Sequence, residues 1–128
     1  TEEIKAKRKA NFDYLYEHLS KYKDLVMPKW VDGADPSWFS FPLSYRNRGP
    51  LVAHLEANGI ETRSLFGGNI TRHPAYKDIK VRYAPSMFEN PECDKILTDS
   101  FWIGVHPRMT QEDLEFVVKT FDYYFKQN

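Results

Sequence analysis

The residues best suited to chemistry lie between Glu61 and Arg72. Glu61 and Arg63 stand two residues apart in a short run typical of a strand, so both side chains leave the same side of a sheet. A carboxylate accepts hydrogen bonds from hydroxyl groups, and a guanidinium grips two phosphate oxygens in a planar fork. The segment therefore predicts a binding site for an anionic ligand.

The loop after this run adds further polar groups. Gly67-Gly68 lets the backbone approach a ligand closely, Asn69 tolerates unusual turn geometry and adds an amide, and Arg72 brings a second cation. Each arginine also has a plainer interpretation, in which it forms a surface salt bridge with a neighbouring acid. The sequence leaves both interpretations open.

The sequence shows binding groups without a pattern for catalysis. We find no nucleophile beside a base, no metal-ligand cluster and no phosphate-cradling glycine loop. His73 and His106 each precede a proline, and a lone histidine is more often structural than a metal ligand. The single cysteine, Cys93, can form neither an internal disulfide nor a cysteine metal site, and is interpreted as an incidental reduced thiol.

Length and charge limit the possible function classes. The 128 residues fit one domain, and lysine plus arginine balance aspartate plus glutamate at 18 each. A basic cluster at residues 5–9 stands beside Glu2 and Glu3 and lacks an aromatic platform, so we expect no nucleic-acid partner. No apolar run approaches the about 20 residues of a membrane span. We therefore expect a cytoplasmic domain with no membrane partner.

The elements that must position the candidate residues alternate along the chain. Apolar residues at three- and four-residue steps predict a long helix over residues 4–25. Aromatic residues between turn signals predict a strand over 37–44, with Pro42 at a sheet edge or near the strand end. A helix over 47–58 should end at Asn58-Gly59, and a short strand should follow over 60–65.

The second half of the chain continues this order. Residues 73–89 give mixed signals and predict irregular structure with room for one helical turn. A helix is expected over 91–98, a strand over 100–106, and a last helix that begins after the capping hydroxyl of Thr110. The apolar face of the last helix comprises Leu114, Val117, Val118, Phe121, Tyr124 and Phe125. The order predicts a two-layer α/β domain with about three strands and helices on one face.

The aromatic residues of the predicted strands raise a further question. Alternation along a strand sends Trp38, Phe39, Phe41, Phe101 and Trp102 to both faces of the sheet. Aromatic side chains on an otherwise open face usually mark an interface. All five could equally be ordinary core, because each buries a large area.

Three motifs together resemble a known family. They are SWFSFPL, GIETRSLFGGNITRHPAY and SFWIGVHPRMTQEDLEFVVKTFDYYF. They look like the C-terminal domain of the DegT/DnrJ/EryC1/StrS sugar aminotransferase family of fold-type I pyridoxal-phosphate enzymes. The TRSLFGGNITR pattern at 62–72 favours its nucleotide-linked 4-keto-6-deoxyhexose 3-dehydratase branch, which serves lipopolysaccharide O-antigen biosynthesis.

The resemblance implies that residues 1–128 are the small domain that closes over a nucleotide-linked keto-deoxysugar. Glu61 and Arg63 would contact this substrate, with Asn69 and Arg72 next. The large domain, absent from this chain, would bind pyridoxal or pyridoxamine phosphate and supply the cofactor lysine, or the histidine that replaces it in dehydratases. An iron–sulfur cluster, a homodimer and a reductase partner are further implications for the full-length enzyme.

This leaves three functional interpretations. The chain is part of a dehydratase, part of a nucleotide-keto-sugar aminotransferase, or a stand-alone module that binds an anion. Under the first two, no catalytic, cofactor or metal residue can be assigned in this chain, so the isolated domain is expected to be inactive.

Overall fold

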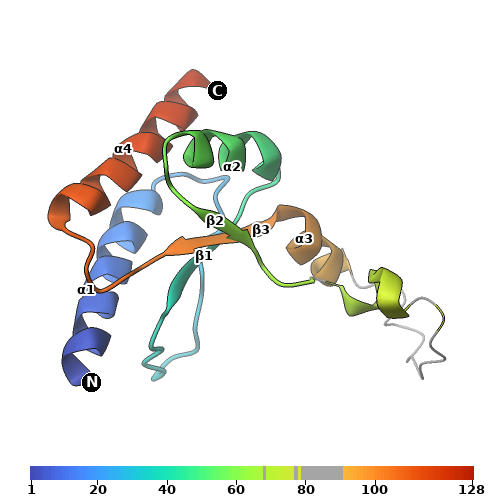
Figure 1. Cartoon of the computed structure of the whole chain (residues 1–128), viewed down its shortest axis with the longest axis horizontal. Helices are drawn as coiled ribbons and strands as arrows, with labels where there is room; N and C mark the ends of the chain where they lie inside the picture. Colours follow the sequence, from blue (N-terminus) through green and yellow to red (C-terminus); the bar gives the residue numbers. More distant parts are fainter. Residues whose placement is uncertain (68, 77, 79–90) are drawn as a thin grey trace.

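The computed structural model describes residues 1–67, 69–76, 78 and 91–128 (Figure 1). Its elements are α1 (Glu2–Leu19), β1 (Ser40–Ser44), α2 (Arg48–Ala57), β2 (Thr62–Ser64), η1 (Ile70–Arg72), η2 (Pro74–Tyr76), α3 (Pro91–Asp99), β3 (Ser100–Gly104) and α4 (Gln111–Gln127). The predicted alternation of helices and strands is confirmed, and the described residues between β2 and α3 include the short 3₁₀ turns η1 and η2. Most of the stretch predicted to be irregular, 73–89, lies outside the described residues.

Helix α1 ends six residues earlier than the sequence pattern predicts. The backbone N–H and the hydroxyl of Ser20 both bond to the carbonyl of Tyr16, and turns follow at Tyr22 and Leu25. Tyr22 and Leu25 fit the helical period, but they reach the core from these turns. Tyr22 stacks on Phe125 of α4 with ring centroids 4.3 Å apart. The prediction of a helix to residue 25 was wrong because an apolar residue in a turn satisfies the same spacing.

The three strands form one antiparallel sheet in the order β1-β3-β2. Strand β3, the last in the sequence, therefore lies in the centre (Figure 1). In this register Ile103 stands opposite both Phe41 and Thr62, and Trp102 stands opposite Arg63.

One face of the sheet carries the core. Phe41, Leu43, Phe101 and Ile103 are each 2% exposed or less and belong to one core cluster with residues of the helices. Helices α1, α2 and α4 lie to one side of the strands (Figure 1). Helix α4 packs against both α1 and α2, which closes the helical layer. Burying a side chain of this size stabilises the fold by roughly 1.5–3 kcal/mol. The predicted two-layer architecture, with helices on one face, is confirmed.

The other face of the sheet carries partly exposed aromatic residues. Phe39 is 63% exposed, and its ring meets that of Trp102 edge-on with centroids 5.9 Å apart. Phe41 and Phe101 are core residues, and Trp38 stacks on the core residue Phe12 at 4.7 Å. The five aromatic residues thus reach both faces of the sheet, as predicted. Alternation accounts for Phe101 and Trp102, but not for Phe39 and Phe41, because Phe39 lies in a bend before β1 begins.

Both edge strands are shorter than predicted. The N–H of Ile60 bonds to the carbonyl of Leu55 and completes the end of α2, so Ile60 precedes the ladder of β2. Strand β2 ends at Ser64, and the chain turns at Phe66, whose φ is 50° and whose N–H bonds to the carbonyl of Ser64. On β1, Ser44 exchanges both backbone hydrogen bonds with Val26, at 2.8 and 3.1 Å. Pro42 lies on this edge strand, as predicted.

Within the described part of the chain, no helix combines the length and the apolar character that crossing a membrane requires.

Candidate functional site

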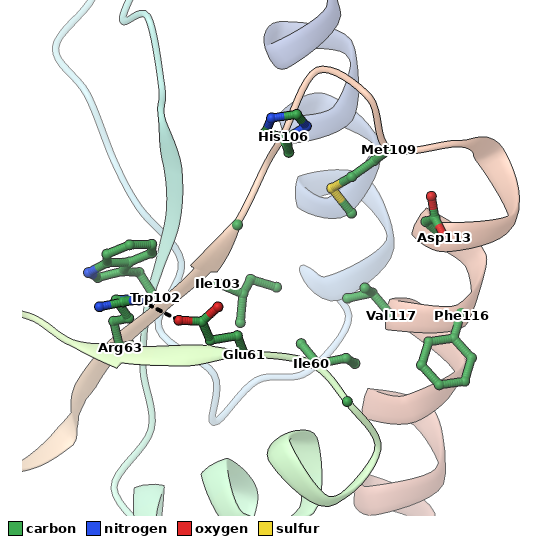
Figure 2. A pocket seen from close by; sticks show the side chains of 12 residues that line it. Ile60, Glu61, Arg63, Trp102, Ile103, His106, Met109, Asp113, Phe116 and Val117 are labelled. Carbon is green, nitrogen blue, oxygen red and sulfur yellow. Dashed lines mark hydrogen bonds and ion pairs between the residues drawn. The ribbon is translucent and has the colours of Figure 1, made fainter.

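A cleft of about 550 Å³ lies beside the edge of the sheet, between the segment that enters β2, the end of β3 and the first turns of α4 (Figure 2). Its lining residues are Gly59, Ile60, Glu61, Arg63, Trp102, Ile103, Gly104, His106, Met109, Asp113, Phe116 and Val117. Two of the four predicted site residues, Glu61 and Arg63, belong to this lining.

The end of α2 brings Glu61 and Arg63 to the cleft. Gly59 has a φ of 80°, a left-handed conformation that glycine adopts without steric cost, and its N–H bonds to the carbonyl of Glu56. The chain then turns directly into β2. Glu61 and Arg63 leave the same side of this segment, as predicted, and Arg63 Nη2 lies 2.5 Å from Glu61 Oε1 (Figure 2).

The Glu61–Arg63 ion pair is open to solvent. The side chains are 74% and 62% exposed, respectively. An exposed pair of this kind contributes at most about 1 kcal/mol, so a ligand with stronger acceptors can displace Glu61 from Arg63. In this chain Arg63 does form the salt bridge that the plainer interpretation predicted, and its place at the cleft also lets it meet an anion.

The far side of the cleft is built by the start of α4. Thr110 is the N-cap of this helix, and Asp113 completes a capping box. Thr110 Oγ1 accepts a hydrogen bond from the Asp113 N–H at 3.2 Å, and the Thr110 N–H donates to Asp113 Oδ2 at 2.7 Å. The bond from the Thr110 backbone lowers the pKa of the Asp113 carboxyl. Asp113 is therefore ionised at neutral pH and serves as a hydrogen-bond acceptor.

Apolar side chains form the remainder of the cleft, and sequence reasoning did not assign them to a site. Ile60, Met109 and Phe116 lie around it, and Trp102 lies beside Arg63 (Figure 2). His106 also lines the cleft, where its Nδ1 accepts the N–H of Arg108 at 3.2 Å. Two signals in the sequence could have pointed to this cleft: Gly59, which fixes where the segment into β2 begins, and the Thr110 cap, which fixes where α4 begins.

Asn69 and Arg72 lie elsewhere, together with Asp94 of α3. Arg72 Nε donates to Asp94 Oδ1 and Arg72 Nη2 donates to Asp94 Oδ2, both at 2.6 Å. Asn69 Nδ2 donates to Asp94 Oδ1 at 2.9 Å. Arg72 and then Asn69 lower the pKa of the Asp94 carboxyl, and Asp94 raises the pKa of Arg72. The structure thus separates the four predicted residues into two pairs, and neither Asn69 nor Arg72 lines the cleft.

The cleft does not suit pyridoxal phosphate. That cofactor is held through a lysine amine in most of the enzymes that use it, and the described lining includes no lysine. Lys5, Lys7 and Lys95 form exposed ion pairs with Asp35, Glu3 and Glu92. Nor does any group of three or more histidine, cysteine, aspartate or glutamate side chains in the described ranges gather as metal ligands would.

Several known proteins are similar to this chain in sequence or in fold. The lipopolysaccharide biosynthesis protein RfbH of Salmonella typhimurium (strain LT2) is 38% identical over 133 residues, 99% of this chain and 30% of RfbH. The dTDP-4-dehydro-2,6-dideoxy-D-glucose 3-dehydratase of Saccharopolyspora spinosa is 39% identical over 119 residues, 88% of this chain and 25% of that enzyme. The solved structure of E. coli GDP-4-keto-6-deoxy-D-mannose-3-dehydratase with bound hydrated PLP covers 92% of this chain with a TM-score of 0.76 and 16% identity.

These relatives are much longer than the chain, which spans 30% and 25% of the two sequences and 31% of the solved structure. The family model described as the DegT/DnrJ/EryC1/StrS aminotransferase family matches residues 1–122, nearly the whole sequence. The chain therefore belongs to the DegT/DnrJ/EryC1/StrS aminotransferase family.

Proposed function

We propose that the chain is the C-terminal small domain of a cytoplasmic, homodimeric nucleotide-sugar enzyme that uses pyridoxal or pyridoxamine phosphate. The activity we assign to this enzyme is 3-dehydration of a 4-keto-6-deoxyhexose, which makes deoxysugars for lipopolysaccharide O-antigen. One observation carries the proposal: identity of 38–39% along almost all of the chain with RfbH and with a 3-dehydratase.

The cleft supplies the substrate contacts in this proposal. Arg63 exchanges Glu61 for the phosphate oxygens of the nucleotide, and Glu61 then accepts hydrogen bonds from sugar hydroxyls. Trp102 and the apolar residues of the cleft exclude water from one side of the ligand. When bound, the cofactor supplies the electron sink for the reaction. The residues that hold it, any iron–sulfur cluster and the surface for a reductase partner would lie outside this chain.

The alternative enzymatic function is transamination of a nucleotide-linked keto-sugar. The family description, which names aminotransferases, favours this alternative. The two reactions differ in their products: a dehydratase removes the 3-hydroxyl as water, whereas an aminotransferase adds nitrogen from an amino donor.

The test is to assay the purified longer protein that contains this chain against CDP-, dTDP- and GDP-linked 4-keto-6-deoxyhexoses, with and without glutamate. We expect mass spectrometry to show a sugar product that has lost the 3-hydroxyl as water and carries no added nitrogen. A glutamate-dependent amino sugar would establish the aminotransferase. No reaction with any of these nucleotide sugars would overturn both enzymatic proposals.

A second test separates the domain proposal from a stand-alone module. The 128-residue chain alone should not retain pyridoxal or pyridoxamine phosphate after desalting, because the proposal places the residues that hold the cofactor in the large domain. Absorbance spectra of the desalted chain, with the longer protein as positive control, measure this. Stoichiometric retention of either cofactor by the chain alone would contradict the proposal that the large domain binds it.

A further inference from the structure

A polar contact of three hydrogen bonds joins Asp94 to the residues that follow β2. Asp94 receives two hydrogen bonds from the guanidinium of Arg72 and one from the amide of Asn69. The donors stand 22 and 25 residues away in the sequence. An arginine fork on a carboxylate fixes orientation as well as distance. Residues 69–76, called here the 69–76 loop, are therefore held to α3 in a defined direction.

This loop has little apolar burial to hold it in place. Ile70 is 64% exposed and Tyr76 is 44% exposed. Asn69, in contrast, is 7% exposed, and its side chain points to Asp94. The buried member of the 69–76 loop thus belongs to the same contact as the Arg72 fork.

Helix α3 is in turn fixed to the sheet layer. Arg48 of α2 donates to the carbonyls of Leu97 and Ser100 at 3.1 and 2.8 Å, and the Tyr45 N–H donates to the Asp99 carbonyl at 3.0 Å. The helix also continues directly into the central strand β3. Asp94 therefore connects an exposed loop to a helix that is hydrogen-bonded to residues 45 and 48 and continues into β3.

We propose that Asp94 is a positioning residue that holds the 69–76 loop and orients Arg72 for a nucleotide-sugar ligand. A guanidinium carries five N–H groups. Asp94 accepts a hydrogen bond from one N–H group on Nε and from one on Nη2, while 58% of the Arg72 side chain stays exposed. The exposed edge is thereby oriented before a ligand arrives, which removes part of the ordering cost of binding. The role in binding rests on the function proposed above, whereas the loop contact does not.

The first experiment tests the loop contact in the 128-residue chain without any ligand. Hydrogen exchange is followed at the N–H groups of Arg72, His73 and Tyr76, which bond to carbonyls within the loop. Asp94→Ala and Asp94→Asn should raise their exchange about fivefold. The control Lys95→Gln removes an exposed ion pair with Glu92 on the same helix and should change nothing. Unchanged exchange in both Asp94 variants, with circular dichroism showing an intact fold, would overturn the proposal.

The second experiment tests positioning in the longer protein, with the nucleotide sugar that it converts fastest. Asp94→Asn should raise the KM more than it lowers kcat, and Lys95→Gln should match the wild type. The double variant Arg72→Asp with Asp94→Arg re-forms the ion pair with reversed charges. It should restore slow exchange in the loop without restoring the KM, because the loop then presents a carboxylate. Faster exchange in Asp94→Asn with a wild-type KM would overturn the positioning role, whereas failure of the proposed function would appear as no conversion by the wild type.

Discussion

Replacing Arg63 by alanine in the longer protein is expected to raise the KM for the nucleotide sugar about two- to thirtyfold. A charge-assisted hydrogen bond contributes about 1.5–3 kcal/mol. Binding must first release Arg63 from Glu61, an exposed pair worth at most about 1 kcal/mol. Subtracting about 1 kcal/mol for this pair leaves a net loss of about 0.5–2 kcal/mol, which corresponds to this range of affinity.

The expected change falls mainly on the KM, since the phosphate contact is the same in the ground state and the transition state. Steady-state kinetics measures both constants. Arg63→Lys should recover part of the affinity, because an ammonium keeps the charge and loses the planar fork. Lys7→Ala is the matched control: it removes another exposed ion pair, with Glu3, far from the cleft in sequence. An Arg63→Ala enzyme with the same KM as Lys7→Ala would remove Arg63 from the site.

Three further predictions concern the domain itself. Phe41→Ala should lower the free energy of unfolding by about 3–5 kcal/mol in urea denaturation, whereas Phe39→Ala, on the open face, should stay within about 0.5 kcal/mol; equal losses would refute the assignment of faces. Thr110→Ala should cost about 0.5–2 kcal/mol through the lost cap of α4, and an unchanged urea midpoint would refute the role of this cap. Because Arg72 lowers the pKa of Asp94, their pairing should persist above the ordinary value of 3.8 and be lost as the pH falls through the lower folded value; Arg72 amide shifts that titrate at or above 3.8 would contradict this.

Local signals in the sequence were sufficient for some features and not for others. The Thr110 cap, the Asn58-Gly59 terminator and the shared side of Glu61 and Arg63 depend on neighbours within four residues, and the structure confirms them. The partner of Arg72 could not be predicted, because Asp94 lies 22 residues away on another element. The cleft could not be predicted either, since its lining comes from three segments that meet only through the central position of β3.

The free edge of β1 has a consequence for how the domain behaves at high concentration. Ser44 directs both backbone groups outward to Val26, so alternate residues of this strand, Pro42 and Ser40, also face outward. Pro42 has no N–H to offer, and the groups of Ser44 are already bonded. A strand from another molecule would find few hydrogen-bonding groups along this edge. Pro42 and the bridge to Val26 thus protect the β1 edge of the sheet from edge-to-edge pairing.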